Sequence, residues 1–159
     1  MHLDITIQTQ GFDPGAEEQR LADLAANAGA LVAFVGRVRG HDGPVALAAL
    51  HLEHYPVVTE NEIARIAHEA AERWPLLGCR VIHRVGRLEP SEPIVLVVIA
   101  ALHRKAAFAA CEFLMDYLKT EAPFWKRELF ADGKQHWVEA KVTDSDACQR
   151  WETPALDIE

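Results

Sequence analysis

The feature that most constrains the fold is the uninterrupted apolar segment at residues 94–102 (IVLVVIAAL). It is far shorter than the roughly 20 residues that a helix needs to cross a bilayer. Its β-branched residues, and the turn-forming stretch at residues 89–93 (EPSEP) before it, favour a strand. We therefore expect a buried strand here, and no membrane segment.

The length of 159 residues fits one domain with a sizeable core. We find no linker, low-complexity tract or internal repeat, and expect a domain over residues 1–151 followed by a tail at 152–159. The first residues lack a basic stretch followed by an apolar stretch, so no signal peptide is visible. Cys79, Cys111 and Cys148 are widely spaced, which favours free thiols in a reducing compartment and a cytoplasmic location.

Periodicity and turn residues predict the elements along the chain. The first helix is expected to start at Asp13-Pro14 and stop at Gly29, and the second to start with a capping box of Thr59 and Glu62 and end at Pro75. Two further helices are expected at 105–120 and 144–151, and strands at 3–8, 30–38, 46–54, 80–86, 94–102 and 136–142. Because strands that neighbour in sequence outnumber βαβ units, we expect an α+β fold with a mainly antiparallel sheet.

Charge is unevenly distributed in this acidic chain. The net charge of −8 argues against general affinity for nucleic acid, which requires a basic face. Seven of the 16 Lys and Arg residues nevertheless fall in three short segments: Arg37, Arg39, Arg104, Lys105, Lys119, Lys126 and Arg127. This grouping indicates a local anion site, although scattered surface charges remain the alternative.

Each of the three segments has a physical reason to bind anions. Alternation along the strand that ends near residue 38 puts Arg37 and Arg39 on the same side, where two guanidinium groups could hold a phosphate. His103-Arg104 lies at the junction of a strand and a helix, where unpaired N–H groups attract anions. In residues 115–128, cations bracket an aromatic pair. Taken singly, none of these features supports an enzymatic role, because a lone histidine after an apolar strand is usually structural, Lys119 alone would be a solvated helix end, and an aromatic pair is more often part of a core.

Motifs for other chemistries are missing from the sequence. It contains no H-E-x-x-H, Walker loop, G-x-G-x-x-G or G-x-S-x-G. His51 and His54 lie on a predicted strand and point to opposite faces, so they make a poor metal pair. We therefore expect no metal and no nucleotide cofactor.

Several segments together resemble the large, catalytic subunit of molybdopterin synthase. They lie in order at 34–39 (FVGRVR), 52–56 (LEHYP), 73–75 (RWP), 81–84 (VIHR), 103–104 (HR) and 115–128 (MDYLKTEAPFWKRE). The resemblance implies a single-domain α/β hammerhead-type fold and a homodimer in which each large subunit binds a small ubiquitin-like sulfur-carrier subunit. It further implies that the carrier's C-terminal Gly-Gly thiocarboxylate delivers sulfur to cyclic pyranopterin monophosphate, and that two rounds build the dithiolene of molybdopterin.

The resemblance also implies which residues form the substrate pocket: Arg37, Val38, Arg39, His103, Arg104, Lys119, Lys126, Arg127 and Glu128. Lys119 and Lys126 are the leading catalytic candidates. Lys119 would transfer a proton or orient the thiocarboxylate carbonyl, while Lys126 and the arginines would hold the phosphate. A lysine crowded by cations should lose its proton more readily, because like charges disfavour the ammonium.

Helix length adds a constraint on this site. A helix between His103 and Lys119 would separate them by about 24 Å, too far for one small ligand. We therefore expect each pocket to take His103 and Arg104 from one protomer, and Lys119 and Lys126 from the other. Two rival readings are a non-catalytic dimeric module that binds a carrier protein or a phosphorylated ligand, and a different enzyme with Cys111 as nucleophile.

Overall fold

The computed structural model describes residues 1–41, 43–139 and 141–152 and has an α+β fold, as expected. The elements, in chain order, are β1 (His2–Gln8), α1 (Pro14–Leu24), β2 (Ala30–Arg37), β3 (Leu47–His54), α2 (Val58–Arg73), β4 (Leu76–Arg84), β5 (Gly86–Leu88), β6 (Pro93–Ala101), α3 (Arg104–Thr120), β7 (Phe124–Phe130), β8 (Gln135–Trp137) and α4 (Val142–Gln149). The strands form two sheets.

The first sheet has the strand order β1–β4–β6–β2. Its β4–β6 and β6–β2 pairs are antiparallel, and only β1 and β4 run parallel. The apolar segment that begins at residue 94 forms most of the inner strand β6, and the residues from Leu96 to Ala101 are fully buried. The predictions of a buried strand and a mainly antiparallel sheet are thus confirmed.

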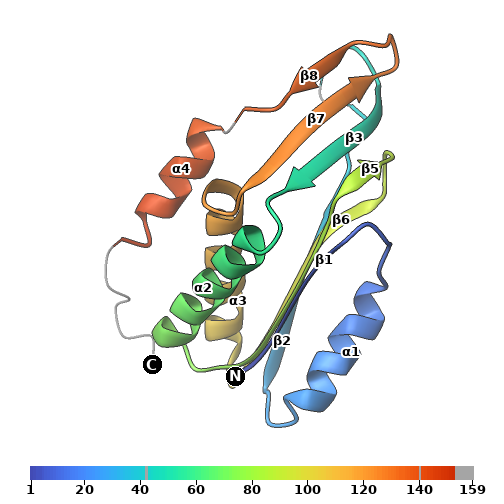
Figure 1. The fold of residues 1–159 in the computed structure, drawn as a ribbon. Helices are drawn as coiled ribbons and strands as arrows, with labels where there is room; N and C mark the ends of the chain where they lie inside the picture. The colour runs from blue at the N-terminus through green and yellow to red at the C-terminus, as the bar shows by residue number, and fades with distance from the viewer. Residues whose placement is uncertain (42, 140, 153–159) are drawn as a thin grey trace.

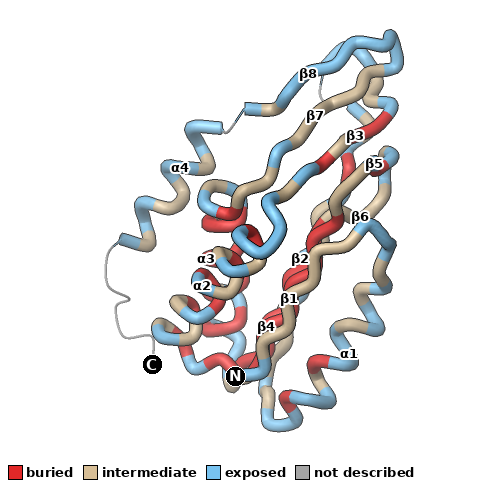
Figure 2. Tube along the Cα trace, in the orientation of Figure 1, coloured by how far each residue is buried: buried red, intermediate tan, exposed pale blue. Residues whose placement is uncertain are grey.

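Helices cover both faces of this sheet, α1 on one side and α2 with α3 on the other (Figure 1). The alternation of strand side chains explains the two layers. Ile82 and Leu96 pack against Leu21 of α1, whereas Val81 and Val97 belong to the larger core formed with α2 and α3. Figure 2 shows the buried positions concentrated along these central strands and on the inner sides of α2 and α3.

The second sheet, ordered β5–β3–β7–β8, is antiparallel throughout and extends beyond the helices (Figure 1). Leu50, Leu52 and Leu88 form a small core with Val38, which follows β2. β7 was not expected from the sequence, because FWKRELF puts charged residues on both faces and lacks an apolar alternation. The strand expected at 136–142 is wrong beyond Trp137, where β8 ends.

The start of α2 differs from the expected capping box. The helix begins at Val58, after Val57 in the left-handed region at φ 73°, and no side chain caps it. Thr59 is fully buried; its hydroxyl accepts a hydrogen bond from the Tyr55 N–H and donates one to the Pro123 carbonyl, both at 3.0 Å. A tertiary contact to the turn before β7 thus replaces the local cap.

The first helix starts as expected, since the Asp13 carboxylate accepts hydrogen bonds from the N–H groups of Gly15 and Ala16. It ends at Leu24, five residues before Gly29. Gly29 serves a close approach instead: an added Cβ would collide with the backbone oxygen of Leu102. No helix in the described ranges is long and apolar enough to span a membrane. All but the first residue of the expected tail at 152–159 lies outside the described residues.

Candidate active site

A pocket of about 560 Å³ lies where the two sheets meet. It is bounded by the end of β2, the C-terminal end of α3, the inner face of β7 and the segment that leads into α4. Its apolar wall includes Leu50, Val95, Met115, Leu118 and Phe124. Its polar lining consists of Arg37, Arg39, His83, Lys119, Lys126, Glu128, Glu139, Lys141 and Asp144.

Strand alternation along β7 places the charged residues at the end of segment 115–128 on two different faces. Lys126 and Glu128 line the pocket, while Arg127 does not. Arg127 pairs in register with Trp137, and its guanidinium lies over that ring at 5.4 Å from the centroid. Its Nε atom is buried and has no hydrogen-bond partner among the described residues. Within one chain, Arg127 therefore belongs to the outer face of the second sheet.

The surroundings of Lys126 in the pocket shift the pKa of its ammonium group. Burial lowers the pKa of its ammonium, and the positive charges of Lys119 and Lys141 lower it further, while Asp144 opposes the shift. Desolvation disfavours a charged amine, and nearby cations do the same. The crowding argued from the sequence therefore acts on Lys126.

Lys119 lies in the last turn of α3, where a cation interacts favourably with the helix dipole. Its Nζ lies 3.9 Å from the Asp144 carboxylate of α4, and its side chain is about half exposed. An exposed pair at this distance contributes little stability, so Lys119 can exchange Asp144 for an anionic ligand.

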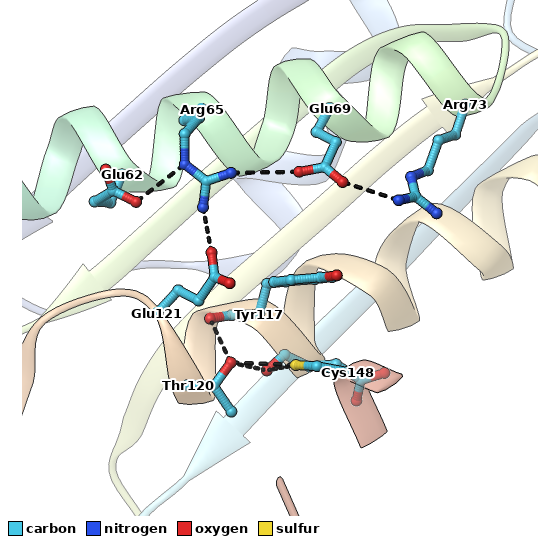
Figure 3. A network of polar contacts seen from close by, with 9 residues as sticks. Glu62, Arg65, Glu69, Arg73, Tyr117, Thr120, Glu121 and Cys148 are labelled. Carbon is cyan, nitrogen blue, oxygen red and sulfur yellow. Dashed lines mark hydrogen bonds and ion pairs between the residues drawn. The ribbon is translucent and has the colours of Figure 1, made fainter. Parts of the chain in front are cut away.

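A network of polar contacts fixes the helix end that carries Lys119 (Figure 3). Arg65 of α2 donates hydrogen bonds to Glu62 and Glu69 of its own helix and to Glu121, directly after α3. On the other side, the Thr120 hydroxyl lies 3.2 Å from the Cys148 sulfur of α4. α2 and α4 thus hold the end of α3 between them.

The arginines at the end of β2 enter the pocket by a route that alternation did not anticipate. β2 ends at Arg37 with a shift in register after Gly36, so Arg39 lies beyond the strand. Arg37 donates from Nε and Nη2 to the Ser91 carbonyl, at 3.0 and 2.7 Å. Val38 between them is buried, and its N–H and C=O bond to residues 92 and 91. These two backbone hydrogen bonds anchor the segment that presents both arginines.

His103 and Arg104 lie at the opposite end of α3 from Lys119. His103 is the N-cap residue without a side-chain cap bond, and both residues are exposed. α3 is continuous from Arg104 to Thr120, so His103 and Lys119 are separated by the length of the helix, as expected from the sequence. Neither residue lines the pocket of its own chain.

Four polar residues of the pocket were missed in the sequence: His83, Glu139, Lys141 and Asp144. Lys141 fell in a range expected to be a strand, and it instead precedes α4. His83 lies on β4, where the VIHR segment contributed only to the resemblance. Cys79, Cys111 and Cys148 are free thiols and none lines the pocket. Across the described parts of the chain, no group of three or more His, Cys, Asp or Glu residues could hold a metal ion.

Comparison with known proteins agrees with this picture. The family model for the MoaE protein matches residues 7–121. The molybdopterin synthase catalytic subunit of Cereibacter sphaeroides is 56% identical over 149 residues, which cover 94% of this chain and 100% of the relative; that of Mesorhizobium japonicum is 55% identical over 150 residues, covering 94% and 93%.

The fold has close counterparts among solved structures. The molybdopterin biosynthesis MoaE protein from Burkholderia ambifaria superimposes with a TM-score of 0.81 at 49% identity, over 96% of this chain and 99% of that one. Sequence and fold agree over nearly the whole length of both chains, so the chain belongs to the MoaE family of molybdopterin synthase catalytic subunits.

Proposed function

We propose that this chain transfers sulfur from the C-terminal thiocarboxylate of a small ubiquitin-like carrier subunit to cyclic pyranopterin monophosphate, forming the dithiolene of molybdopterin in the cytoplasm. The observation that carries the proposal is the pocket itself, in which a half-buried lysine with a lowered pKa lies among further cations. Both reactants are anions, and a cationic pocket attracts both although the chain as a whole is acidic.

The two lysines divide the work between charge and proton transfer. Because the ammonium of Lys126 is disfavoured, Lys126 suits proton transfer at the reacting centre. Lys119, Arg37 and Arg39 supply positive charge for the phosphate and the thiocarboxylate. This assignment reverses the roles that we expected from the sequence, since burial and cation crowding act on Lys126.

The chemistry sets what the pocket must hold. When the thiocarboxylate sulfur forms a bond to a pterin carbon, the oxygen substituent that it replaces on that carbon must leave, and the bond between the sulfur and the carrier's acyl carbon must break. The acyl carbon then takes an oxygen from water, and the carrier leaves as a carboxylate. A volume of about 560 Å³, open to the surface beside Lys119, suits a pterin phosphate together with the end of an extended chain.

The site is complete only when a second protomer contributes. His103 and Arg104 are separated from the pocket by the length of α3, and the N-terminal turn of this helix contains no acidic residue. Its unpaired N–H groups and Arg104 therefore form an anion-attracting end that serves the pocket of a partner protomer. Mixing a His103→Ala chain with a Lys119→Ala chain should restore part of the activity that each homodimer lacks. No recovery after demonstrated exchange of protomers would contradict the shared site.

The role of Lys126 is tested by single-turnover conversion with thiocarboxylated carrier and cyclic pyranopterin monophosphate, followed by mass analysis of the pterin. Lys126→Ala should slow conversion by about 10²- to 10⁴-fold, the range of a lost acid–base group. Lys126→Arg should be nearly as slow, because a guanidinium keeps the charge but does not release a proton. The exposed Lys134 in the β7–β8 turn supplies the control, and Lys134→Ala should convert normally.

Two results would count against this proposal. A Lys126→Arg chain that converts at the wild-type rate would reduce Lys126 to a source of charge. A wild-type chain that yields no sulfurated pterin would overturn the assigned reaction.

A further inference from the structure

His83 is a pocket residue to which the proposed reaction assigns no role. It lies near the end of β4, on the side of the first sheet that faces α3, and its partner across the antiparallel pair is Val95, which also lines the pocket. Only 7% of the residue is exposed. This exposed remainder opens into the pocket, beside Phe124 and Lys126.

Hydrogen bonding fixes the tautomer of the ring. Nδ1 lies 2.8 Å from the Arg84 carbonyl oxygen, which can only accept a hydrogen bond. Nδ1 therefore carries the proton and Nε2 holds a lone pair. Nε2 has no hydrogen-bond partner among the described residues. Burial lowers the pKa of the ring to about 4, and the charge of Lys126 acts in the same direction, so the imidazole is neutral at physiological pH.

Packing fixes the direction of this lone pair. The ring stacks on Phe124 with 3.8 Å between centroids and 18° between planes. Phe124 and Lys126 lie on the same face of β7, so the strand that carries the proposed catalytic lysine also packs against the imidazole of His83. A neutral acceptor held in a fixed orientation is therefore part of the pocket wall.

This acceptor decides which end of a ligand can lie against it. Phosphate and thiocarboxylate oxygens accept hydrogen bonds, and an acceptor with no proton cannot bind them. A ring N–H or an amino group can satisfy Nε2, and a pterin carries both kinds of donor. The anionic groups must then lie toward Arg37, Arg39 and Lys119, at the open side of the pocket.

We propose that His83 is a specificity-determining residue whose Nε2 accepts a hydrogen bond from an N–H donor of the pterin, so that the heterocycle lies against His83 and Phe124 while the phosphate lies toward the arginines. The inference rests on the proposed function, since it takes a pterin phosphate as the ligand. A site built to bond an N–H rejects analogues that lack it, because its buried acceptor is then left unpaired.

Two substitutions separate the two ring nitrogens. The amide N–H of His83→Asn reaches the position of Nδ1, so this variant keeps the bond to Arg84 and loses the acceptor. The longer side chain of His83→Gln brings an amide oxygen to the position of Nε2, so this variant keeps an acceptor toward the pocket. The binding of cyclic pyranopterin monophosphate, measured by calorimetry on the homodimer without carrier, compares them. Inorganic phosphate serves as the second probe, and thermal unfolding of each chain is the control for folding.

We expect His83→Asn to bind the pterin about tenfold more weakly, as for a buried donor left unpaired, and to bind inorganic phosphate as the wild type does. His83→Gln should stay within about threefold of the wild type for both probes. A His83→Asn chain with wild-type pterin affinity would overturn the inference. Equal losses for pterin and phosphate in both variants would also overturn it, because they would indicate a structural role.

The failure of this inference is distinguishable from the failure of the proposed reaction. Wild-type pterin affinity in His83→Asn, alongside normal sulfur transfer by the wild-type chain, overturns the role of His83 alone. The absence of both pterin binding and sulfurated product with the wild-type chain overturns the reaction and the role of His83 together.

Discussion

The hydroxyl of Thr59 offers a quantitative test of how the fold supports the pocket. Thr59 is fully buried in the first turn of α2, and its hydroxyl joins the Tyr55 N–H to the Pro123 carbonyl at 3.0 Å on each side. Pro123 directly precedes β7, so this link ties the loop before α2 to the strand that carries Lys126. Thr59→Val keeps the shape of the side chain and removes both hydrogen bonds.

The expected cost follows from what each substitution leaves behind. A buried backbone group without a partner costs about 1–3 kcal/mol. Tyr55 is an exposed residue and Pro123 a half-buried one, so the lower end of this range applies to each group, and Thr59→Val should cost about 2–3 kcal/mol in total. Thr59→Ser keeps the hydroxyl and deletes one buried methyl group, at about 1 kcal/mol. The conservative change in shape should therefore be the more damaging one.

Urea unfolding of the two variants, at unchanged m-value, measures this difference. In a chain of this size, about 2–3 kcal/mol corresponds to a fall in Tm of about 4–12 °C for Thr59→Val. Single-turnover sulfur transfer should slow in the same variant, since the start of β7 loses its anchor. A Thr59→Ser chain that is destabilised as much as Thr59→Val would refute the reasoning, because packing rather than hydrogen bonding would then dominate.

Three further predictions concern the pocket lysine, a buried thiol and two glycines. Because the folded state lowers the pKa of Lys126, the unfolded chain binds more protons between the lowered and the ordinary value, and wild-type stability rises with pH there. Lys126→Met should thus unfold at higher urea than the wild type at pH 7, with a smaller gain at pH 9.5 and no activity at either. Burial raises the pKa of the Cys111 thiol to about 11, so Cys111→Ser should retain single-turnover activity, and its loss would favour a cysteine nucleophile. Gly29→Ala should lower the urea midpoint more than Gly78→Ala, because its Cβ meets a backbone oxygen, whereas that of Gly78 meets the end of the flexible Leu21 side chain at 2.7 Å.

Elements defined by local signals were predictable from the sequence. The apolar run gave β6, Tyr55-Pro56 ended β3 after His54, and the helix expected at 105–120 is α3. Elements that depend on distant contacts were not predictable. β7 pairs with β3 on one side and β8 on the other, and its Lys126 and Glu128 face a pocket rather than a core. Its stability comes from its neighbours, so no apolar periodicity marks it.

The missed strand also explains what sequence reasoning could not resolve in the site. From the sequence, we assigned all three neighbouring residues Lys126, Arg127 and Glu128 to the pocket. Once the segment is a strand, alternation sends Lys126 and Glu128 to one face and Arg127 to the other. The identity of the cations was thus readable from the sequence, whereas the face that each occupies required the register of β7 against its neighbours.

α3 links the remaining cations to the oligomeric state. Its N-terminal end presents His103 and Arg104, where the helix dipole adds positive potential, and its C-terminal end presents Lys119, where the dipole stabilises the ammonium. The helix rises by about 24 Å between them. This is roughly two to three Debye lengths at physiological ionic strength, so the charges at the two ends are largely screened from each other. Each end can therefore hold an anion only with cations supplied by another element. Lys126 and Arg39 line the same pocket as Lys119, and under the proposed shared site Arg104 serves the pocket of a second copy. In the proposed dimer a two-fold axis would make this exchange reciprocal and give two complete pockets, so specific activity should fall once dilution separates the protomers.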